Sequence, residues 1–134
     1  MQLSILNLKL PKVRIWIKKR QKIAKMYSNE LKNTSLLLPY KKKDSEHVYH
    51  LYTVYHKKRN LILQKLRKEK IFLKIYYPFP IHKMNGYKSS ICDNCDCLPI
   101  TEKMAKGVFS LPLYPELNIN TVKKIIKTVK RVLK

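Results

Sequence analysis

Two segments with apolar residues at helical spacing frame the chain and constrain its fold most strongly. The first follows Pro11 and comprises Val13, Trp16, Ile17, Arg20, Ile23, Ala24, Tyr27 and Leu31. The second lies near the C-terminus, opposite a lysine-rich face, and comprises Val122, Ile125, Ile126, Val129, Val132 and Leu133. This period predicts two amphipathic helices, each burying one face. Pro11 should kink the N-terminal helix or restart it, and Asn118 or Asn120 can cap the C-terminal one.

Three segments between these helices are rich in strand-forming residues. They are 47–56 (HVYHLYTVYH), 71–75 (IFLKI) and 108–113, and their Val, Ile, Tyr, Thr and Phe content predicts strands. Two further helices are expected at 59–70 and 99–106. Pro99 suits the first turn of the latter, and Gly107 is expected to end it as a left-handed C′ residue.

The order is therefore helix, strand, helix, strand, loop, helix, strand, helix. This order predicts a single domain of the α/β class, with α+β character, over residues 1–134. We expect a sheet of about three strands with helices packed on one face. Residues 1–32 would form a long helix, and residues 47–134 would form the body.

The chain has a formal net charge of +22, carried by 25 lysines and 5 arginines. Such a charge suggests nucleic acid or another anionic surface as a partner. However, specific readers of nucleic acid usually rely on arginine, whose planar fork binds phosphate and guanine in two places. The bases are also spread along the whole sequence. We therefore favour lysines on solvated positions and keep weak, salt-sensitive nucleic-acid binding as the alternative function.

Several functional classes are disfavoured. No run of about 18 apolar residues predicts a membrane span, and 2 glycines leave no glycine-rich phosphate loop. With 8 acidic residues, no paired carboxylates or Ser-His-Asp arrangement emerge. The 3 cysteines are an odd number, which argues against a disulfide framework and favours a cytoplasmic location.

Two groups of potential metal ligands need an interpretation. Cys92, Cys95 and Cys97 suggest zinc, but a closed zinc site needs four ligands, so we favour three thiols in a polar loop over a metal site or a regulatory disulfide. His47, His50 and His56 would share one strand, too far apart to bind one metal. We expect partly buried strand histidines with backbone partners, and no metal site.

Residues 75–82, IYYPFPIH, form the most unusual segment. The two prolines fix their own φ and push the preceding residues toward extended geometry, so the segment must be a stiff loop. It could be a rigid connector whose aromatic side chains close the sheet edge. Alternatively, it could present Tyr76, Tyr77 and His82 to a ligand.

Four segments, taken in order, resemble one enzyme family. They are LNLKLPKVRIWIKKRQKIAKMYSNEL at 6–31, SEHVYHLYTV at 45–54, KIYYPFPIHKMNGY at 74–87 and LPITEKMAKGVFSLPLYPELN at 98–118. Together with the final helix they resemble the C-terminal part of the DegT/StrS-type sugar aminotransferases. The resemblance covers nearly the whole chain and implies the C-terminal domain of a fold-type I pyridoxal-phosphate enzyme that aminates nucleotide-linked keto-sugars.

In that family the proline loop stands near the sugar-nucleotide site, at an interface between subunits. The resemblance thus implies that Tyr76, Tyr77 and His82 bind substrate. Tyr76 departs from the family, which usually has histidine there. Lys70 stands where the family usually has a helix-ending glycine, and a left-handed lysine there would cost about 1 kcal/mol.

The resemblance also implies that essential parts lie outside this sequence. The Schiff-base lysine, the acid that pairs with the pyridine nitrogen and the phosphate-binding residues belong to a large domain that precedes this region in the family. We therefore expect a truncated or split enzyme part with no catalytic or cofactor-binding residue, no pyridoxal phosphate of its own and no activity alone. Its expected partners are a missing or separately encoded large domain and, as in the family, a second subunit. Alone, the uncovered apolar face of 13–31 should make the chain aggregate, oligomerise or bind a hydrophobic dye.

Overall fold

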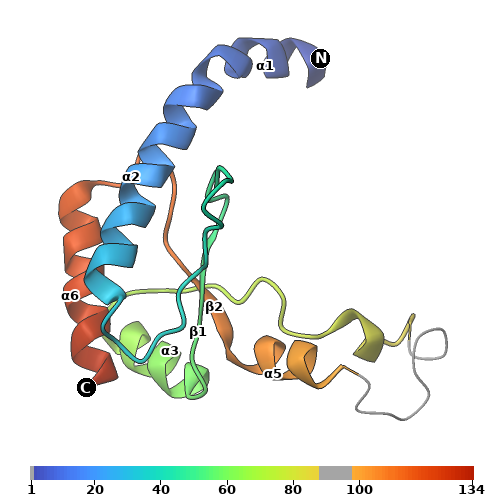
Figure 1. Cartoon of the computed structure of the whole chain (residues 1–134), viewed down its shortest axis with the longest axis vertical. Coiled ribbons are helices and arrows are strands. Elements are labelled where there is room, and N and C mark those ends of the chain that lie inside the picture. The colour runs from blue at the N-terminus through green and yellow to red at the C-terminus, as the bar shows by residue number, and fades with distance from the viewer. Residues whose placement is uncertain (1, 88–97) are drawn as a thin grey trace.

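The computed structural model describes residues 2–87 and 98–134. Its helices and strands follow one another along the chain as drawn in Figure 1. They are α1 (Gln2–Lys9), the 3-10 turn η1 (Leu10–Lys12), α2 (Val13–Leu31), β1 (Tyr52–Tyr55), α3 (Arg59–Lys68), the 3-10 turn η2 (Ile81–Lys83), α5 (Pro99–Gly107), β2 (Val108–Leu111) and α6 (Ile119–Leu133).

Strands β1 and β2 form an antiparallel pair, from Tyr52 opposite Leu111 to Tyr55 opposite Val108. The prediction of about three strands was wrong, because the described residues form a sheet of two strands. Segment 71–75 pairs with β2 through an isolated bridge between Lys74 and Ser110 rather than as a regular strand. It has no room to extend further, since Lys70 turns the chain immediately before it with a φ of 59° and the proline loop follows.

The strand predicted at 47–56 is likewise shorter than expected. Tyr49 adopts a φ of 48°, in the left-handed region that breaks an extended chain. The regular strand therefore begins only at Tyr52. An additional isolated bridge joins Tyr55 to Leu37.

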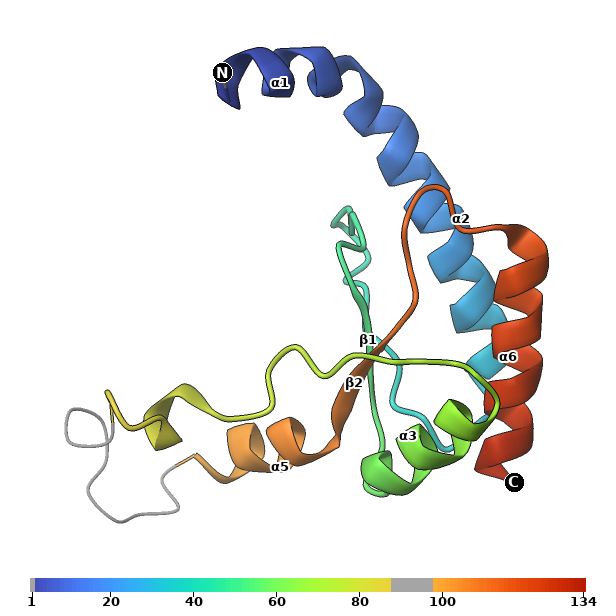
Figure 2. The same cartoon turned by 180° about the vertical axis from the view of Figure 1, so that it is seen from behind.

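The core lies between the sheet and helices α2, α3 and α6, with α2 and α6 on the same side of the sheet (Figures 1 and 2). Both predicted helical stripes are confirmed in part, the first over its C-terminal half and the second over its first four members. Buried members of these stripes are Ile23, Ala24, Tyr27, Leu31, Val122, Ile125, Ile126 and Val129. They pack with Tyr52, Val54, Phe109 and Leu111 of the strands and Ile62 and Leu66 of α3.

Several predictions about helix ends are confirmed. Pro11 lies in the 3-10 turn η1, which separates α1 from α2, so the long helix predicted over 1–32 restarts there. Lys70 adopts the left-handed conformation that was expected for it. The Asn118 side chain caps α6 by accepting a hydrogen bond of 2.8 Å from the backbone N–H of Asn120.

Helix α5 ends at Gly107, as predicted, but the C′ geometry expected there was wrong. This residue is the last of α5, and no described glycine has a positive φ. A glycine is needed here for steric reasons, because a Cβ at this position would clash with Cε2 of Tyr55. Gly107 therefore permits close contact between the end of α5 and the ring of Tyr55.

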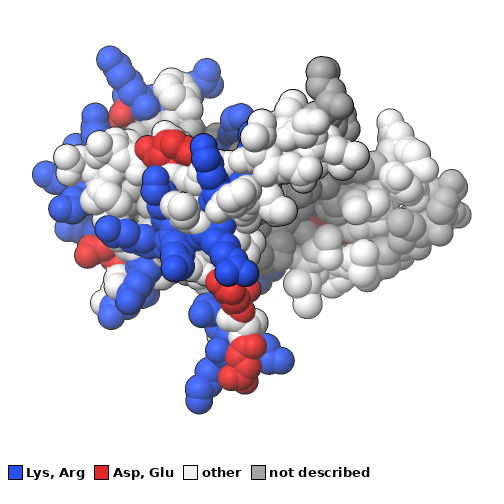
Figure 3. Space-filling model, turned by 90° about the horizontal axis from the view of Figure 1, so that it is seen from above, with Lys and Arg blue, Asp and Glu red and all other residues white. Residues whose placement is uncertain are grey.

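We call the sheet, the buried part of α2, α3 and α6 the body of the molecule. Two arms extend from the same side of this body (Figures 1 and 2). The helical arm is α1 with the beginning of α2, and the loop arm is the chain of residues 72–87 with α5. Many large apolar side chains on the arms are exposed, namely Leu3, Ile5, Leu6, Leu8, Leu10, Ile15, Phe72, Tyr76, Tyr77, Phe79, Ile81, Met84, Leu98 and Ile100. Lysine and arginine gather on one half of the face seen in Figure 3, and exposed lysines also lie on the arms, such as Lys9 on α1 and Lys103 on α5.

Candidate functional site

The loop that carries the predicted site residues is joined to the sheet and then departs from it. The backbone N–H of Ser110 donates a 3.0 Å hydrogen bond to the carbonyl of Lys74. Beyond this point the chain leaves the body in an extended course (Figure 2). Pro80 is extended, with a φ of −65° and a ψ of 144°, as expected for a proline-stiffened segment. Turn η2 follows it.

The structure separates the three predicted site residues into two groups. Tyr76 and Tyr77 lie at the surface, with 49% and 73% of their areas exposed. Phe79 and Ile81 are exposed in the same way. His82, by contrast, is 4% exposed and points inward.

His82 belongs to a hydrogen-bonded cluster with the neighbouring Lys83 and with Glu102 on α5. Its Nε2 lies 3.2 Å from Oε1 of Glu102, while Nζ of Lys83 lies 2.7 Å from the other carboxylate oxygen, Oε2. The hydrogen bond from Lys83, and next that from His82, lower the pKa of Glu102 below its usual range. The carboxylate is thus ionised at neutral pH and links the loop to α5.

Glu102 was not among the residues predicted for the site. The sequence signal that could have indicated it was weak, since an acid in the first turn of a helix is explained by the helix dipole alone. Its contact with a histidine 20 positions earlier becomes visible only in three dimensions.

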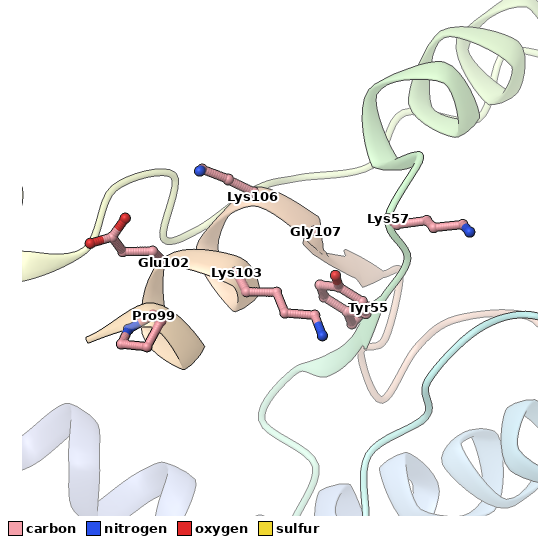
Figure 4. A pocket seen from close by; sticks show the side chains of 7 residues that line it. All are labelled: Tyr55, Lys57, Pro99, Glu102, Lys103, Lys106 and Gly107. Atoms are coloured by element: carbon pink, nitrogen blue, oxygen red, sulfur yellow. The ribbon is translucent and has the colours of Figure 1, made fainter. Parts of the chain in front are cut away.

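A shallow pocket of about 430 Å³ lies beside Glu102, between α5 and β1 (Figure 4). It is lined by Tyr55, Lys57, Pro99, Glu102, Lys103, Lys106 and Gly107. The side chain of Lys103 extends toward Tyr55, whereas those of Lys57 and Lys106 point away (Figure 4). The three ammonium groups do not converge on one point, so the pocket is not arranged to grip a phosphate.

Two of the three histidines of 47–56 are partly buried and bond to the local backbone, whereas the prediction of partial burial was wrong for His50, which is exposed. Nδ1 of His47 accepts a hydrogen bond from the backbone N–H of Tyr49, and Nδ1 of His56 accepts one from that of Lys58, both at 2.9 Å. The backbone partners expected for these two are confirmed, but the expectation that His47, His50 and His56 share one strand was wrong because β1 begins at Tyr52.

Metal ligands do not gather in the part of the chain that is described. No three side chains of His, Cys, Asp or Glu there could hold a metal ion together. Cys92, Cys95 and Cys97 lie outside the described residues. In residues 2–87 and 98–134, no helix combines the length and apolarity needed to cross a membrane.

The sequence and the fold both match known proteins. Residues 1–130 match the DegT/DnrJ/EryC1/StrS aminotransferase family. The chain belongs to this family. It is 34% identical to dTDP-3-amino-3,4,6-trideoxy-alpha-D-glucose transaminase of Micromonospora megalomicea subsp. nigra, over 98% of this chain and 36% of that protein. It is 31% identical to dTDP-3-amino-3,6-dideoxy-alpha-D-galactopyranose transaminase of Aneurinibacillus thermoaerophilus, over 98% of this chain and 35% of that protein.

The structure of this family member superposes on S. venezuelae DesV in complex with a ketimine intermediate, with a TM-score of 0.95 and 27% identity. The match covers 100% of this chain and 36% of DesV. The chain thus spans about a third of the length of its relatives. These comparisons confirm the resemblance and lend no support to the alternative of a nucleic-acid-binding domain.

The described residues do not fit pyridoxal phosphate by themselves. A Schiff-base lysine is usually activated in a desolvated site, yet all described lysines are exposed except Lys130. Lys130 is half-buried and pairs with Glu30 at 2.6 Å. Glu102 is the one buried carboxylate among the described residues, and it already contacts His82 and Lys83. Within residues 2–87 and 98–134, neither an amine nor an acid is therefore placed for the cofactor.

Proposed function

We propose that this chain is the C-terminal domain of a nucleotide-sugar aminotransferase. The observation that carries this proposal is the superposition of the entire chain on DesV with a TM-score of 0.95. The two arms are included in that match. The chain therefore has the conformation of the corresponding part of DesV even in the arms, which do not pack on its core.

The proposed substrate is a keto-sugar linked to a nucleoside diphosphate. Relatives are named as transaminases of dTDP-linked amino sugars, and another, from Acidithiobacillus ferrooxidans, as a 3-aminotransferase of UDP-N-acetyl-3-dehydro-alpha-D-glucosamine. We propose Tyr76 and Tyr77 as contacts to this substrate, because both rings are exposed on a stiff loop. His82 completes the proposed substrate loop from its buried side.

The proposed partner is a large aminotransferase domain that holds the cofactor, within one polypeptide or as a separate chain. A Bacillus subtilis relative of 26% identity, NtdA, contains bound pyridoxamine phosphate. In the assembled enzyme the cofactor would supply the electron sink for amine transfer. Apolar side chains on both arms offer a surface for the large domain and for the second subunit of a dimer.

Reconstitution tests this function. The chain is co-expressed with the part of the Micromonospora transaminase that lies outside the match, and pyridoxal phosphate, an amino donor and a dTDP-linked keto-sugar are supplied. Mass spectrometry then measures aminated sugar. We expect product from the combination and none from the chain alone, with less product from Tyr77→Ala.

The matched control replaces this chain with the aligned third of the Micromonospora protein itself. If that control forms product and the combination with this chain does not, across several nucleotide-linked keto-sugars, the proposed function is wrong.

A further inference from the structure

Segment 76–84 has an inverted arrangement of side chains. Its large apolar groups face solvent, whereas its histidine is buried. Tyr77, Phe79 and Ile81 are 73%, 67% and 61% exposed, and His82 is 4% exposed. Burial of apolar area therefore cannot be what holds this segment in place.

Among the described residues, the backbone hydrogen bonds of the segment are local. The N–H of Lys83 donates to the carbonyl of Pro80, and that of Met84 donates to the carbonyl of Ile81, both at 3.0 Å. These bonds form turn η2 but do not attach it to another element.

Attachment to α5 comes through side chains. His82 and Lys83, adjacent in the chain, reach different oxygens of the same carboxylate, that of Glu102, at 3.2 Å and 2.7 Å. The carboxylate is 10% exposed as a side chain. A bridge of this kind fixes both the position and the rotation of the turn, because two donors converge on two acceptor atoms.

We propose that Glu102 is a positioning residue, which acts through His82 and Lys83 to set where the loop displays Tyr76 and Tyr77. The identity of the ligand that Tyr76 and Tyr77 contact rests on the proposed function. The anchoring of the loop by Glu102 does not depend on that function, so it can be tested on this chain alone.

Hydrogen exchange measured by mass spectrometry provides the test. We expect Glu102→Ala to raise the exchange rate of the Lys83 and Met84 amides about tenfold. In the variant, opening of the turn no longer has to break the two charge-assisted bonds to the carboxylate. Glu102→Gln should have a smaller effect, since its amide oxygen can still accept from His82. Peptides from α6 should exchange as in the unmodified chain.

The matched control is Glu30→Gln. Glu30 also pairs with a lysine, Lys130, at 2.6 Å, but on the body rather than on the loop. We expect this change to leave exchange in 76–87 unaltered.

Two outcomes would overturn the proposal. One is an unchanged loop in Glu102→Ala. The other is an equal acceleration in α5, which would mean that Glu102 only stabilises the first turn of its own helix. In the reconstituted enzyme, Glu102→Ala is further expected to raise KM for the nucleotide sugar several-fold, with cofactor content unchanged. If no reconstituted enzyme forms product, the proposed function fails while the exchange result still decides the role of Glu102.

Discussion

Large apolar residues are buried in the body of this molecule but exposed on its arms. Leu66, on α3, is fully buried, whereas Leu8, on α1, is 76% exposed. The body follows the usual rule, in which apolar side chains from two amphipathic helices and a small sheet pack on one another. The arms expose such side chains in two separate stretches, on α1 with the start of α2 and on the proline loop with α5. Exposed apolar surface of this kind is typical of contact sites.

This difference indicates that the packing that stabilises the body does not also hold the arms in their conformation. The body can be stabilised by its own core, while the arms keep the shape of a relative about three times as long. We propose that the remainder of an aminotransferase supplies what the arms lack. Substitutions should therefore affect the two regions very differently.

The largest contrast is expected between two leucines. Leu66→Ala should lower the free energy of unfolding by about 3 kcal/mol, because it leaves a cavity in the body. Leu8→Ala should change it by less than about 0.5 kcal/mol at a protein concentration low enough to keep the chain monomeric, because no packing within one copy is lost. Urea denaturation followed by circular dichroism measures both. Equal losses would contradict the division into body and arms.

Substitution of Gly107 tests the close contact between α5 of the loop arm and Tyr55 of the body. Gly107→Ala should cost about 2 kcal/mol, because the new methyl group meets the Tyr55 ring. Gly86→Ala is the matched control, since a Cβ there would have nothing within 4 Å. Thermal unfolding compares the two, and a harmless Gly107→Ala would show that the ring moves aside freely.

The body should also respond to alkali through its buried tyrosines. Burial raises the pKa of Tyr27 and of Tyr52 above the ordinary value near 10. The folded state thus resists ionisation, so their contribution to stability is complete below about pH 10 and declines as pH rises further. Tyr27 also donates a 2.9 Å hydrogen bond to the carbonyl of Pro112.

Tyr27→Phe separates these effects. At pH 8 the unmodified chain should be more stable by about 1 kcal/mol, the usual net value of such a hydrogen bond. At pH 11 this advantage should shrink or reverse. An advantage that stays constant between the two pH values, measured by urea unfolding, would show that Tyr27 is not protected from ionisation.

The smallest expected effect is a gain. Lys70→Gly should raise the free energy of unfolding by about 0.5 to 1 kcal/mol, because glycine adopts the left-handed conformation without a Cβ clash. Lys65→Gly, inside α3, should instead lower it by about 1 kcal/mol. Should both changes destabilise the chain to the same extent, the strain assigned to Lys70 would be absent.

The sequence predicted features governed by local rules. Helical periodicity located α2, α3 and α6, and the effects of Pro11, Lys70 and Asn118 followed from their own backbone and capping preferences. The strands were predicted too long, since residues such as Val48 and Phe72 have strand propensity but no partner strand beside them. Pairing is a tertiary property that composition does not encode.

The candidate site was predictable in the same partial way. The prolines indicated a stiff loop, and the exposure of Tyr76 and Tyr77 agrees with display. The burial of His82 was not foreseeable, because it depends on Glu102 arriving from another element. Gly107 was misassigned for a related reason: its role is set by the distant Tyr55 ring, whereas a helix-ending glycine is the common local explanation.

Light scattering on the purified chain tests the central claim most directly. If the arms are uncovered contact surfaces, the chain should self-associate or bind a hydrophobic dye, giving a mass above the 16.0 kDa of one copy. Association should weaken when Leu8 and Leu10 are changed to glutamate. A soluble 16.0 kDa monomer that binds no dye would contradict the account.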